Sequence, residues 1–412
     1  MTTATFDEKK LQGAHSHGGA GDPLAPAKTR AAQIQSTNVD DFPKLTGREE
    51  EWRFTPLRRL RGLHDGTWKP AEEFPRHQLG VVSEDGLAPL PAGVTASNIK
   101  STDERVGSIL TPFDRPSAQA FTQAAESLLV SVAANAVVEQ PVIVRLAGGT
   151  TEGAVFGHTF IEVGESAEVT IVLDQVGAVT LADNVEISVG PNARVKLVSI
   201  ADWEADSVQL QHQKARIGRD GSLVHIAVTL GGNLVRQYFS AEFAGPGAEV
   251  ESYGIYFATG SGAKTGQHFE HRLMVDHAIP DCRSHVTYRG ALQGADAHTV
   301  WVGDVLIQAA ATGTDTYEIN RNLILSDGAR ADSIPNLEIE TGEIVGAGHA
   351  SATGRFDDEQ LFYLQARGIP EDDARRLVVR GFFAELINKI GVPELQERLS
   401  QSIEDRLAKA GV

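Results

Sequence analysis

The sequence has little cysteine, few aromatic residues and no long apolar run. One of its 412 residues is cysteine, Cys282, so no disulfide can form within the chain and no site of four thiolates can be built from it alone. Its apolar runs are far shorter than the roughly 20 residues that a membrane-spanning helix needs. Positive charge is also scarce, because 37 Lys and Arg stand against 55 Asp and Glu, which gives a net charge of −18. Such a surface repels phosphate backbones and anionic lipids, so we expect neither nucleic acid nor membrane as a partner.

Glycine, by contrast, is frequent, with 41 residues, and much of it separates short runs rich in Val and Ile. Between residues 141 and 345 many of these runs alternate apolar and polar side chains, as half-buried strands do. Gly, Asp and Asn stand between them as turn residues. The pattern predicts a mainly β protein. Examples of the runs are PVIVRL, HTFIEV, AEVTIVL, NVEISV and ARVKLVSI.

The turns before several of these strands repeat as GESAEV, GPNARV, GRDGSLV and GPGAEV. A period near 27 residues fits one coil of a β-helix, whereas a propeller blade needs about 40 residues. One coil cannot bury its inner face alone, so the coils must stack into one elongated core. We therefore predict a β-helix, with an immunoglobulin-like sandwich as the runner-up. The small residues aligned before the strands are Ala167, Ala193, Ser222, Ala248 and Ala329, at spacings of 26, 29, 26 and 81.

The region before the β-rich core is expected to divide into a tail and a domain. Residues 1–35 hold too few apolar side chains to offset the entropy of ordering, so we predict a disordered tail. Residues 36–138 are predicted to form an N-terminal domain of helices and loops. In it, a helix starting near residue 46 is broken at Pro56, and residues 117–138 form one amphipathic helix.

The β-helix core is assigned to residues 139–350, and residues 351–412 are predicted to form three helices. Asp357 or Asp358 caps the first helix and Gly368 ends it. Pro370 opens the second helix, and Gly391 and Pro393 mark its end. Such a helical domain can cap the end of a solenoid or dock a partner. The second helix is expected to bury one face made of Ala374, Leu377, Val378, Gly381, Phe382 and Leu386.

A group of histidines is the first candidate for chemistry. Four histidines lie close in sequence to Asp276, Asp281 and Cys282. Histidine, aspartate and cysteine are the residue types that bind metals in proteins. Neighbouring residues of a strand point to opposite faces, however, so ordinary structural roles are the favoured interpretation. The histidines concerned are His268, His271, His277 and His285.

A second candidate is His349, which lies in the segment IVGAGHASATG. Small residues on both sides predict an imidazole that is not crowded. We place it between the last β segment and the first C-terminal helix. A second function is left open, that of a β-helix enzyme that acts on polysaccharides. Such enzymes present carboxylates and basic residues on one face of the solenoid, and the spacing of these residues in the sequence does not exclude that arrangement.

Longer stretches resemble the SufB/SufD proteins of the SUF iron–sulfur cluster assembly system. PNLEIETGEIVGAGHASATGRFDDEQLFYLQARGI at 335–369 is similar to the C-terminal signature of that family. TDTYEINRNLILSDGARADSIPNLEI at 314–339 extends the likeness upstream, and EEWRFTPL at 50–57 resembles the N-terminal motif of the SufD branch. The resemblance therefore covers most of the chain after the tail.

Within the family, the sequence is more similar to SufD than to SufB. SufB-like chains carry more cysteines and a glutamate directly after the histidine, where this chain has Ala350. Many SufD relatives have a cysteine two residues before the histidine, where this chain has Ala347. A ligand role for that thiol therefore cannot apply here.

The resemblance implies a right-handed parallel β-helix flanked by N-terminal and C-terminal α-helical domains. It implies a non-catalytic scaffold subunit in the cytoplasm, in complex with a SufB-like paralogue and the ATPase SufC, and leaves a homodimer open. SufC would bind the C-terminal helices around residues 357–390, and the two β-helices would pair near their C-terminal strands. A transient iron–sulfur cluster, or iron, would be held at that interface by a SufB cysteine and His349, with none bound tightly by this chain alone. The residues expected to contact SufC are Phe362, Tyr363, Arg367, Gly368, Leu377 and Phe382.

Overall fold

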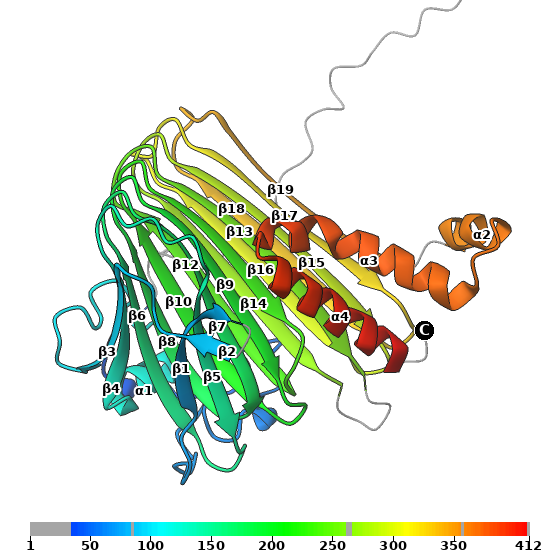
Figure 1. The fold of residues 1–412 in the computed structure, drawn as a ribbon, viewed down its shortest axis with the longest axis horizontal. Coiled ribbons are helices and arrows are strands. Elements are labelled where there is room, and N and C mark those ends of the chain that lie inside the picture. Colours follow the sequence, from blue (N-terminus) through cyan, green and yellow to red (C-terminus); the bar gives the residue numbers. More distant parts are fainter. Residues whose placement is uncertain (1–33, 84–85, 261–265, 356–357, 410–412) are drawn as a thin grey trace, which may run out of the picture. The chain divides into compact units, whose positions relative to one another are not determined.

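Two sheets of short strands, joined by turns, form the core of the protein in the computed structural model (Figure 1). The structure describes residues 34–83, 86–260, 266–355 and 358–409. From β4 onward, successive strands alternate between the two sheets and pair in parallel with the strand two places along the chain. Two strands therefore make one coil, and about seven coils stack. The predicted β-helix with helices toward both ends is confirmed, and the sandwich is wrong because its sheets would be antiparallel.

We name each sheet after its last strand. In spatial order, the β19 sheet contains β19 (Gly346–Arg355), β17 (Asp315–Ile324), β15 (Arg283–Gln293), β13 (Glu249–Thr259), β11 (Ser222–Thr229), β9 (Arg194–Trp203), β7 (Glu168–Ala178), β5 (Val142–Gly149), β1 (Arg76–Ser83) and β2 (Gly86–Ala88). The β18 sheet contains β18 (Arg330–Ile339), β16 (His298–Ile307), β14 (His268–His277), β12 (Leu234–Phe243), β10 (Val208–Ile217), β8 (Thr180–Val189), β6 (Val155–Val163), β4 (Glu126–Val132) and β3 (Val94–Lys100). The α-helices are α1 (Arg115–Gln123), α2 (Asp358–Ala366), α3 (Glu371–Ile390) and α4 (Pro393–Lys409), and short 3-10 turns lie at Val39–Asp41, Glu50–Trp52 and Leu57–Arg59.

One corner of the coil has the same backbone conformation in successive turns. Ser166, Asn192, Asp220 and Gly247 all have left-handed φ angles, between 54° and 75°. The N–H of each donates to a carbonyl oxygen of the next coil at 2.9–3.1 Å. Gly, Asn and Asp adopt this conformation at the least cost. The repeated turn motifs of the sequence therefore mark this stacked corner.

The coils are less regular than the sequence spacing suggested. The register shows that Ser222 is equivalent to the residue after Ala193, so the alignment of these two small residues was one position off. Ala329 precedes β18 and so belongs to the other sheet. The period of 27 holds for the early coils, and the later ones contain longer turns. The equivalent first residues in the β19 sheet are Glu168, Arg194, Ser222, Glu249, Arg283, Asp315 and Gly346.

The N-terminal region contains more strand than predicted. The helix expected over 117–138 is wrong in its second half, because α1 ends at Gln123 and β4 follows. Leu128 and Val130 of β4 pack into the solenoid core, and β4 pairs in parallel with β6. Burial against a neighbouring strand here overrides the helix propensity of the segment. The helix predicted before Pro56 is replaced by short 3-10 turns on either side of it.

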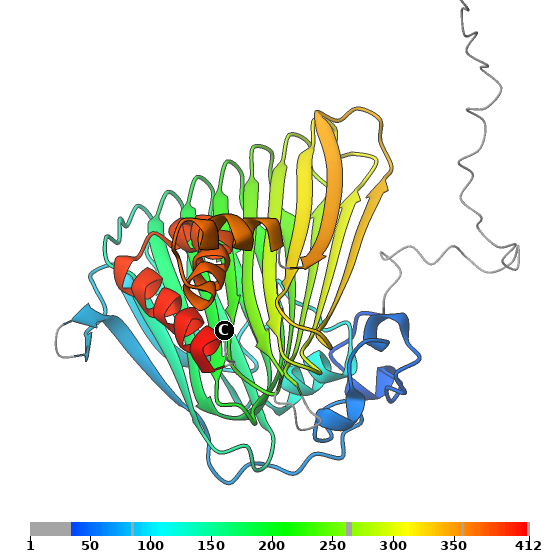
Figure 2. The ribbon, with the colours of Figure 1, turned by 90° about the vertical axis from the view of Figure 1, so that its right-hand side faces the viewer.

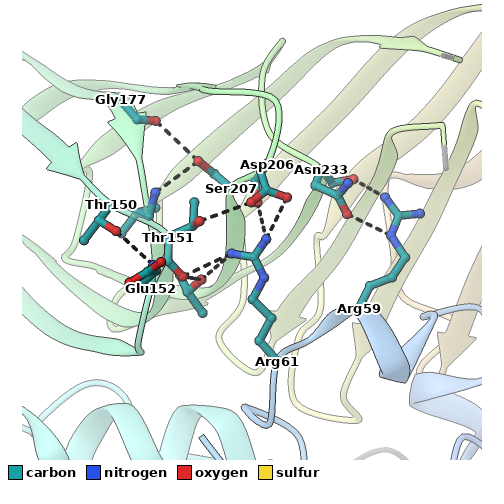
Figure 3. A network of polar contacts seen from close by, with 11 residues as sticks. Arg59, Arg61, Thr150, Thr151, Glu152, Gly177, Asp206, Ser207 and Asn233 are labelled. Carbon is teal, nitrogen blue, oxygen red and sulfur yellow. Dashed lines mark hydrogen bonds and ion pairs between the residues drawn. The ribbon is translucent and has the colours of Figure 1, made fainter. Parts of the chain in front are cut away.

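Two arginines of the N-terminal segment fix it to the ends of several coils (Figure 3). The Arg61 guanidinium donates to the Thr180 hydroxyl at 2.8 Å and to the backbone carbonyl of Asp206 at 2.7 Å. Arg59 donates to the side-chain oxygen of Asn233 at 2.9 Å. Because these acceptors come from three different coils, the hydrogen bonds of this segment link neighbouring coils.

The helices α3 and α4 lie against the outer face of the β19 sheet (Figures 1 and 2). Phe383 and Leu399 are buried there together with Val198 and Ile226 of the sheet. The predicted helix boundaries are confirmed, since Pro370 precedes α3 and Gly391 follows it with a φ of 70°. The capping role proposed for Asp357 lies outside the described residues. Within those residues, none of the helices has the length and apolar character of a membrane span.

The face that α3 buries differs from the predicted one. Leu377 is 47% exposed and Phe382 is half-buried, although both were expected in the core. The helix is rotated relative to the prediction because its buried face packs against both the β19 sheet and α4. The side chains that α3 buries are Ala374, Val379, Phe383, Leu386, Ile387 and Ile390.

A buried carboxylate ties α4 to the sheet. Asp174 of β7 accepts hydrogen bonds from Arg398 of α4 at 2.6 and 3.1 Å and from Arg145 of β5 at 2.9 Å. Burial alone would raise the pKa of Asp174, but the two guanidinium groups hold it below its usual value. The ionised carboxylate is therefore the form that holds the helix in place.

Replacing Asp174 with alanine is expected to lower the free energy of unfolding by about 2 kcal/mol, because both arginines lose a buried acceptor. Urea denaturation followed by circular dichroism measures the change. Glu168→Ala is a suitable control, since Glu168 is an exposed carboxylate on the same strand. If Asp174→Ala lowered the free energy of unfolding no more than the control does, Asp174 would not be what holds α4 against the sheet.

Candidate functional site

His349 lies within β19, the end strand of its sheet (Figure 1). Its side chain is 41% exposed, as expected from its small neighbours. The expectation that it lies between the last strand and the first helix is wrong, because β19 continues to Arg355. The coil therefore presents the imidazole from a hydrogen-bonded strand, which holds it more firmly than a loop would.

A buried carboxylate lies beside this imidazole. Glu318 of β17 is the register partner of His349, and its side chain is 2% exposed. Its Oε1 lies 3.8 Å from Nδ1 of His349. Gly303 on β16 leaves room for the carboxylate, because a Cβ there would lie 2.3 Å from Oε2 of Glu318. The pair places an accessible nitrogen beside a buried carboxylate, at a separation longer than a hydrogen bond.

Sequence reasoning missed Glu318. It precedes His349 by 31 residues, and only the coil length links the two positions. The signal was nonetheless present, because equivalent positions in successive coils are strand neighbours. The correct coil period at this end of the chain would have identified the pair.

Ala347 shares a face of β19 with His349, since the two are separated by one residue. Its methyl group packs against the small apolar cluster of Val305, Ile307 and Ala311. A side chain at this position lies about 7 Å along the strand from that of His349. Position 347 therefore belongs to the same side of the coil as the histidine.

The four histidines that cluster in the sequence are dispersed in space. His268 lies on the outer face of the β18 sheet, where its Nδ1 is 3.1 Å from Nδ1 of His298. His271 and His277 are buried, and burial lowers their pKa values to about 3 and about 4. His285 is exposed on β15. In the part of the chain that the structure describes, no three His, Cys, Asp or Glu residues are placed to hold a metal ion.

Cys282 is buried at a corner of the coil, in line with the small residues of the repeat. Its thiol lies 3.5 Å from the carbonyl oxygens of Gly245 and Pro280. Burial raises the pKa of the thiol to about 11. Since the thiolate is the nucleophile and the ligand, this cysteine acts as a small core residue rather than as a reactive group.

The residues expected to contact an ATPase fall on α2, α3 and the turn between them. Phe362 and Tyr363 of α2 are 71% and 56% exposed, and Leu377 of α3 is 47% exposed. The guanidinium of Arg367 lies 4.7 Å from the ring centre of Tyr363. Gly368, with a φ of 87°, makes the turn after α2. We call Phe362, Tyr363, Arg367 and Leu377 the helical surface; Phe382 is half-buried and contributes less.

Three further exposed apolar side chains lie on or next to the last two coils. Tyr317, Ile339 and Val345 are 41%, 46% and 75% exposed. Among the described strands, β18 and β19 are the ends of their sheets. We call these three side chains, together with the free edges of the two strands, the terminal face. An unpaired strand edge of this kind is a ready template for pairing with another chain.

The fold and the site define a β-solenoid that carries an accessible histidine on its last coil and a helical extension. A family described as "SUF system FeS cluster assembly, SufBD core domain" matches residues 145–382. The chain is 52% identical over 387 residues to an iron–sulfur cluster assembly SufBD family protein of Mycobacterium bovis, covering 92% of this chain and 94% of the relative. It is 25% identical over 389 residues to the iron–sulfur cluster assembly protein SufD of Escherichia coli, covering 88% and 89%.

A second SufBD family protein of Mycobacterium bovis is 26% identical over 206 residues, which cover 50% of this chain and 24% of that longer relative. The chain belongs to the SufBD family of the SUF iron–sulfur cluster assembly system. The resemblance noted in the sequence is thereby confirmed, and SufD proteins are among the relatives.

Proposed function

We propose that this chain is a SufD-type, non-catalytic scaffold subunit of a cytoplasmic complex that assembles iron–sulfur clusters. It pairs with a SufB-like paralogue through the terminal face and binds a SufC-like ATPase through the helical surface. His349 is a ligand of the nascent cluster. The observation that carries the proposal is the accessible imidazole of His349 beside the buried carboxylate of Glu318 on the last coil.

The chemistry of the pair suits a cluster that must leave again. Thiolates are the main ligands of iron–sulfur clusters, and an imidazole can replace a thiolate at an iron. We propose that this chain supplies one nitrogen ligand and the paralogue a thiolate, so the cluster is held by few bonds. The Glu318 carboxylate orients the ring, as carboxylates beside metal-binding histidines do.

The terminal face supports pairing with a homologous β-helix. Exposed strand edges next to exposed apolar side chains suit an interface in which the sheets continue from one chain into the other. The longer second relative in Mycobacterium bovis is the kind of paralogue that such an interface needs. A second copy of this chain would fit the same edges, and the test must separate the two arrangements.

The assembly is tested by co-expressing this chain with a SufB-like paralogue and a SufC-like ATPase, both from the organism that encodes this chain. Native mass spectrometry then gives the composition of the complex. We expect one mass containing all three kinds of chain. If the measured mass corresponds to two copies of this chain and does not change when the paralogue is present, the proposed pairing with the paralogue would be contradicted. A monomer that releases reducing ends from polysaccharides would instead support the enzyme alternative.

Replacing Phe362 and Tyr363 together with alanine is expected to weaken ATPase binding by a factor of about 30, or about 2 kcal/mol, because exposed aromatic anchors dominate protein interfaces. Isothermal titration calorimetry with the purified ATPase measures the affinity. Val137→Ala, which removes a side chain that is 69% exposed on a distant coil, is the control. Equal affinities for the two variants would show that the ATPase binds elsewhere.

A further inference from the structure

A cavity of about 170 Å³ opens into the interior of the first coils. Leu128 of β4, Val155 of β6 and Leu181 of β8 line it from the β18 sheet, and Leu146 of β5 lines it from the β19 sheet. The first three are at most 6% exposed. A dry cavity of about 150 Å³ in another protein takes up benzene. The volume and the apolar wall therefore suit an organic group of four to six carbons, far from the terminal face.

The cavity has a carboxylate in its wall. Asp183 of β8 is 8% exposed and lies next to the cavity. Its Oδ2 accepts a hydrogen bond from Gln211 at 2.6 Å and its Oδ1 accepts one from Gln209 at 3.3 Å. Both donors are neutral amides, and the described residues give Asp183 no ion pair with an arginine or a lysine. Burial raises the pKa of Asp183 to about 7, although the amide hydrogen bonds lower it.

Space beside this carboxylate is kept open by a glycine. Gly157 of β6 is the register neighbour of Asp183, and a Cβ there would lie 3.3 Å from Cβ of Asp183. A second carboxylate, Glu126, lies in the more exposed part of the lining and accepts a hydrogen bond from the amide of Asn98 at 3.0 Å. The cavity thus combines an apolar part of its wall with two carboxylates and with the neutral polar groups of Asn98, Ser127 and Thr159, and His77 and His158 also line it. Its electrostatic potential favours a positively charged ligand.

We infer that this cavity binds a small organic cation, an alkylammonium whose ammonium group pairs with Asp183 while its carbon chain lies against Leu128, Val155 and Leu181. A buried carboxylate without a counter-ion is costly, and a cationic ligand would remove that cost. A carboxylate has about four lone-pair sites, and Gln209 and Gln211 use two of them, so an ammonium N–H can donate to a site that is left. The inference is independent of the proposed function, because it concerns the opposite end of the solenoid.

Calorimetric titration of the full chain at pH 8.5 with n-butylammonium, and with n-butanol as the neutral analogue of the same length, tests the site. We expect saturable binding of n-butylammonium to the wild type. Asp183→Asn is expected to reduce that affinity about tenfold or more, because it removes the charge and keeps the shape. The affinity for n-butanol should be the same in both proteins.

A second variant separates the site from a general effect of charge. Gly157→Ala leaves both carboxylates in place and narrows the space beside Asp183, so it should weaken binding of n-butylammonium without changing the net charge. Thermal unfolding followed by circular dichroism shows whether each variant is folded. Equal binding of n-butylammonium to the wild type and Asp183→Asn, or no saturable binding to the wild type, would overturn the inference.

Discussion

Replacing Glu270 with alanine is expected to lower the free energy of unfolding by about 3–5 kcal/mol. Glu270 is fully buried on β14, and its Oε1 lies 3.2 Å from Nε of Arg236 and 3.4 Å from Nη1 of Arg272. The two arginine side chains are only 4% and 3% exposed. The substitution would remove the carboxylate that the two buried cations share, leaving Arg236 with Asp114 and Arg272 with Glu51 as remaining counter-charges. Breaking a buried ion network in this way is more costly than losing a surface pair.

The same charges hold the N-terminal segment on the outer face of the β18 sheet. Arg236 and Arg272 each donate to the backbone carbonyl of Glu51, at 2.9 and 3.0 Å. The guanidinium of Arg236 also stacks on the ring of Trp52, 3.8 Å from its centre. Glu270 further accepts a hydrogen bond from the Thr55 hydroxyl. Loss of Glu270 should therefore loosen residues 49–56 before the solenoid itself unfolds.

Urea denaturation gives the stability of the Glu270→Ala variant, and hydrogen–deuterium exchange over residues 49–56 shows where the loss is located. Glu204→Ala removes an exposed glutamate from a turn and should change the stability by no more than about 0.5 kcal/mol. If Glu270→Ala resembled this control, or if exchange rose equally in all coils, the network would not be what anchors the segment.

The pKa of Glu270 adds a test by pH. Burial alone would raise it, but Arg236, His268 and Arg272 hold it well below its usual value. A carboxyl group whose pKa is lower in the folded than in the unfolded state contributes stability above its unfolded pKa, about 4.3, and that stability is lost as the pH falls below it. The stability difference between the wild type and Glu270→Gln should therefore shrink between about pH 6 and pH 3. A constant difference would contradict an ionised Glu270.

Much of the fold could be predicted because the coil repeats a local signal. The corner at Asn192 and Asp220 requires a left-handed backbone, and few residues adopt it easily, so the sequence marks the corner in successive coils. The ends of α3 could be predicted for a similar reason, because Pro370 and Gly391 fix them through backbone conformation alone.

What could not be predicted depends on contacts distant in sequence. The run ESLLVSV at 126–132 follows a helix and contains helix formers, and its pairing with β3 on one side and β6 on the other makes it a strand. The buried face of α3 is likewise set by the sheet and by α4, which pack against it. Glu318 could not be placed beside His349 without the length of that coil. The histidine was a candidate from its small neighbours, the family resemblance implied a role as a ligand, and that role is still a prediction.

Replacing His349 with alanine is expected to reduce cluster assembly by the complete complex at least tenfold while leaving the fold intact. The side chain is 41% exposed, and its Nδ1 lies 3.8 Å from Oε1 of Glu318, which is longer than a hydrogen bond, so its loss should cost no more than about 0.5 kcal/mol of stability. Reconstitution with iron and sulfide, followed by the absorbance and Mössbauer spectra of the complex, measures the cluster formed. Native mass spectrometry of the same sample shows whether all subunits are still present.

Two further variants distinguish a ligand from a residue with only a structural role. His349→Cys should restore part of the cluster yield with an altered spectrum, because a thiolate can bind iron where the imidazole did. His285→Ala, which removes an exposed histidine from the outer face of β15, should assemble clusters as the wild type does. Glu318→Gln should give an intermediate yield, because it keeps the shape of the side chain that orients the ring and removes its charge. Normal yields from His349→Ala, or no recovery with His349→Cys in an intact complex, would rule out ligation by His349.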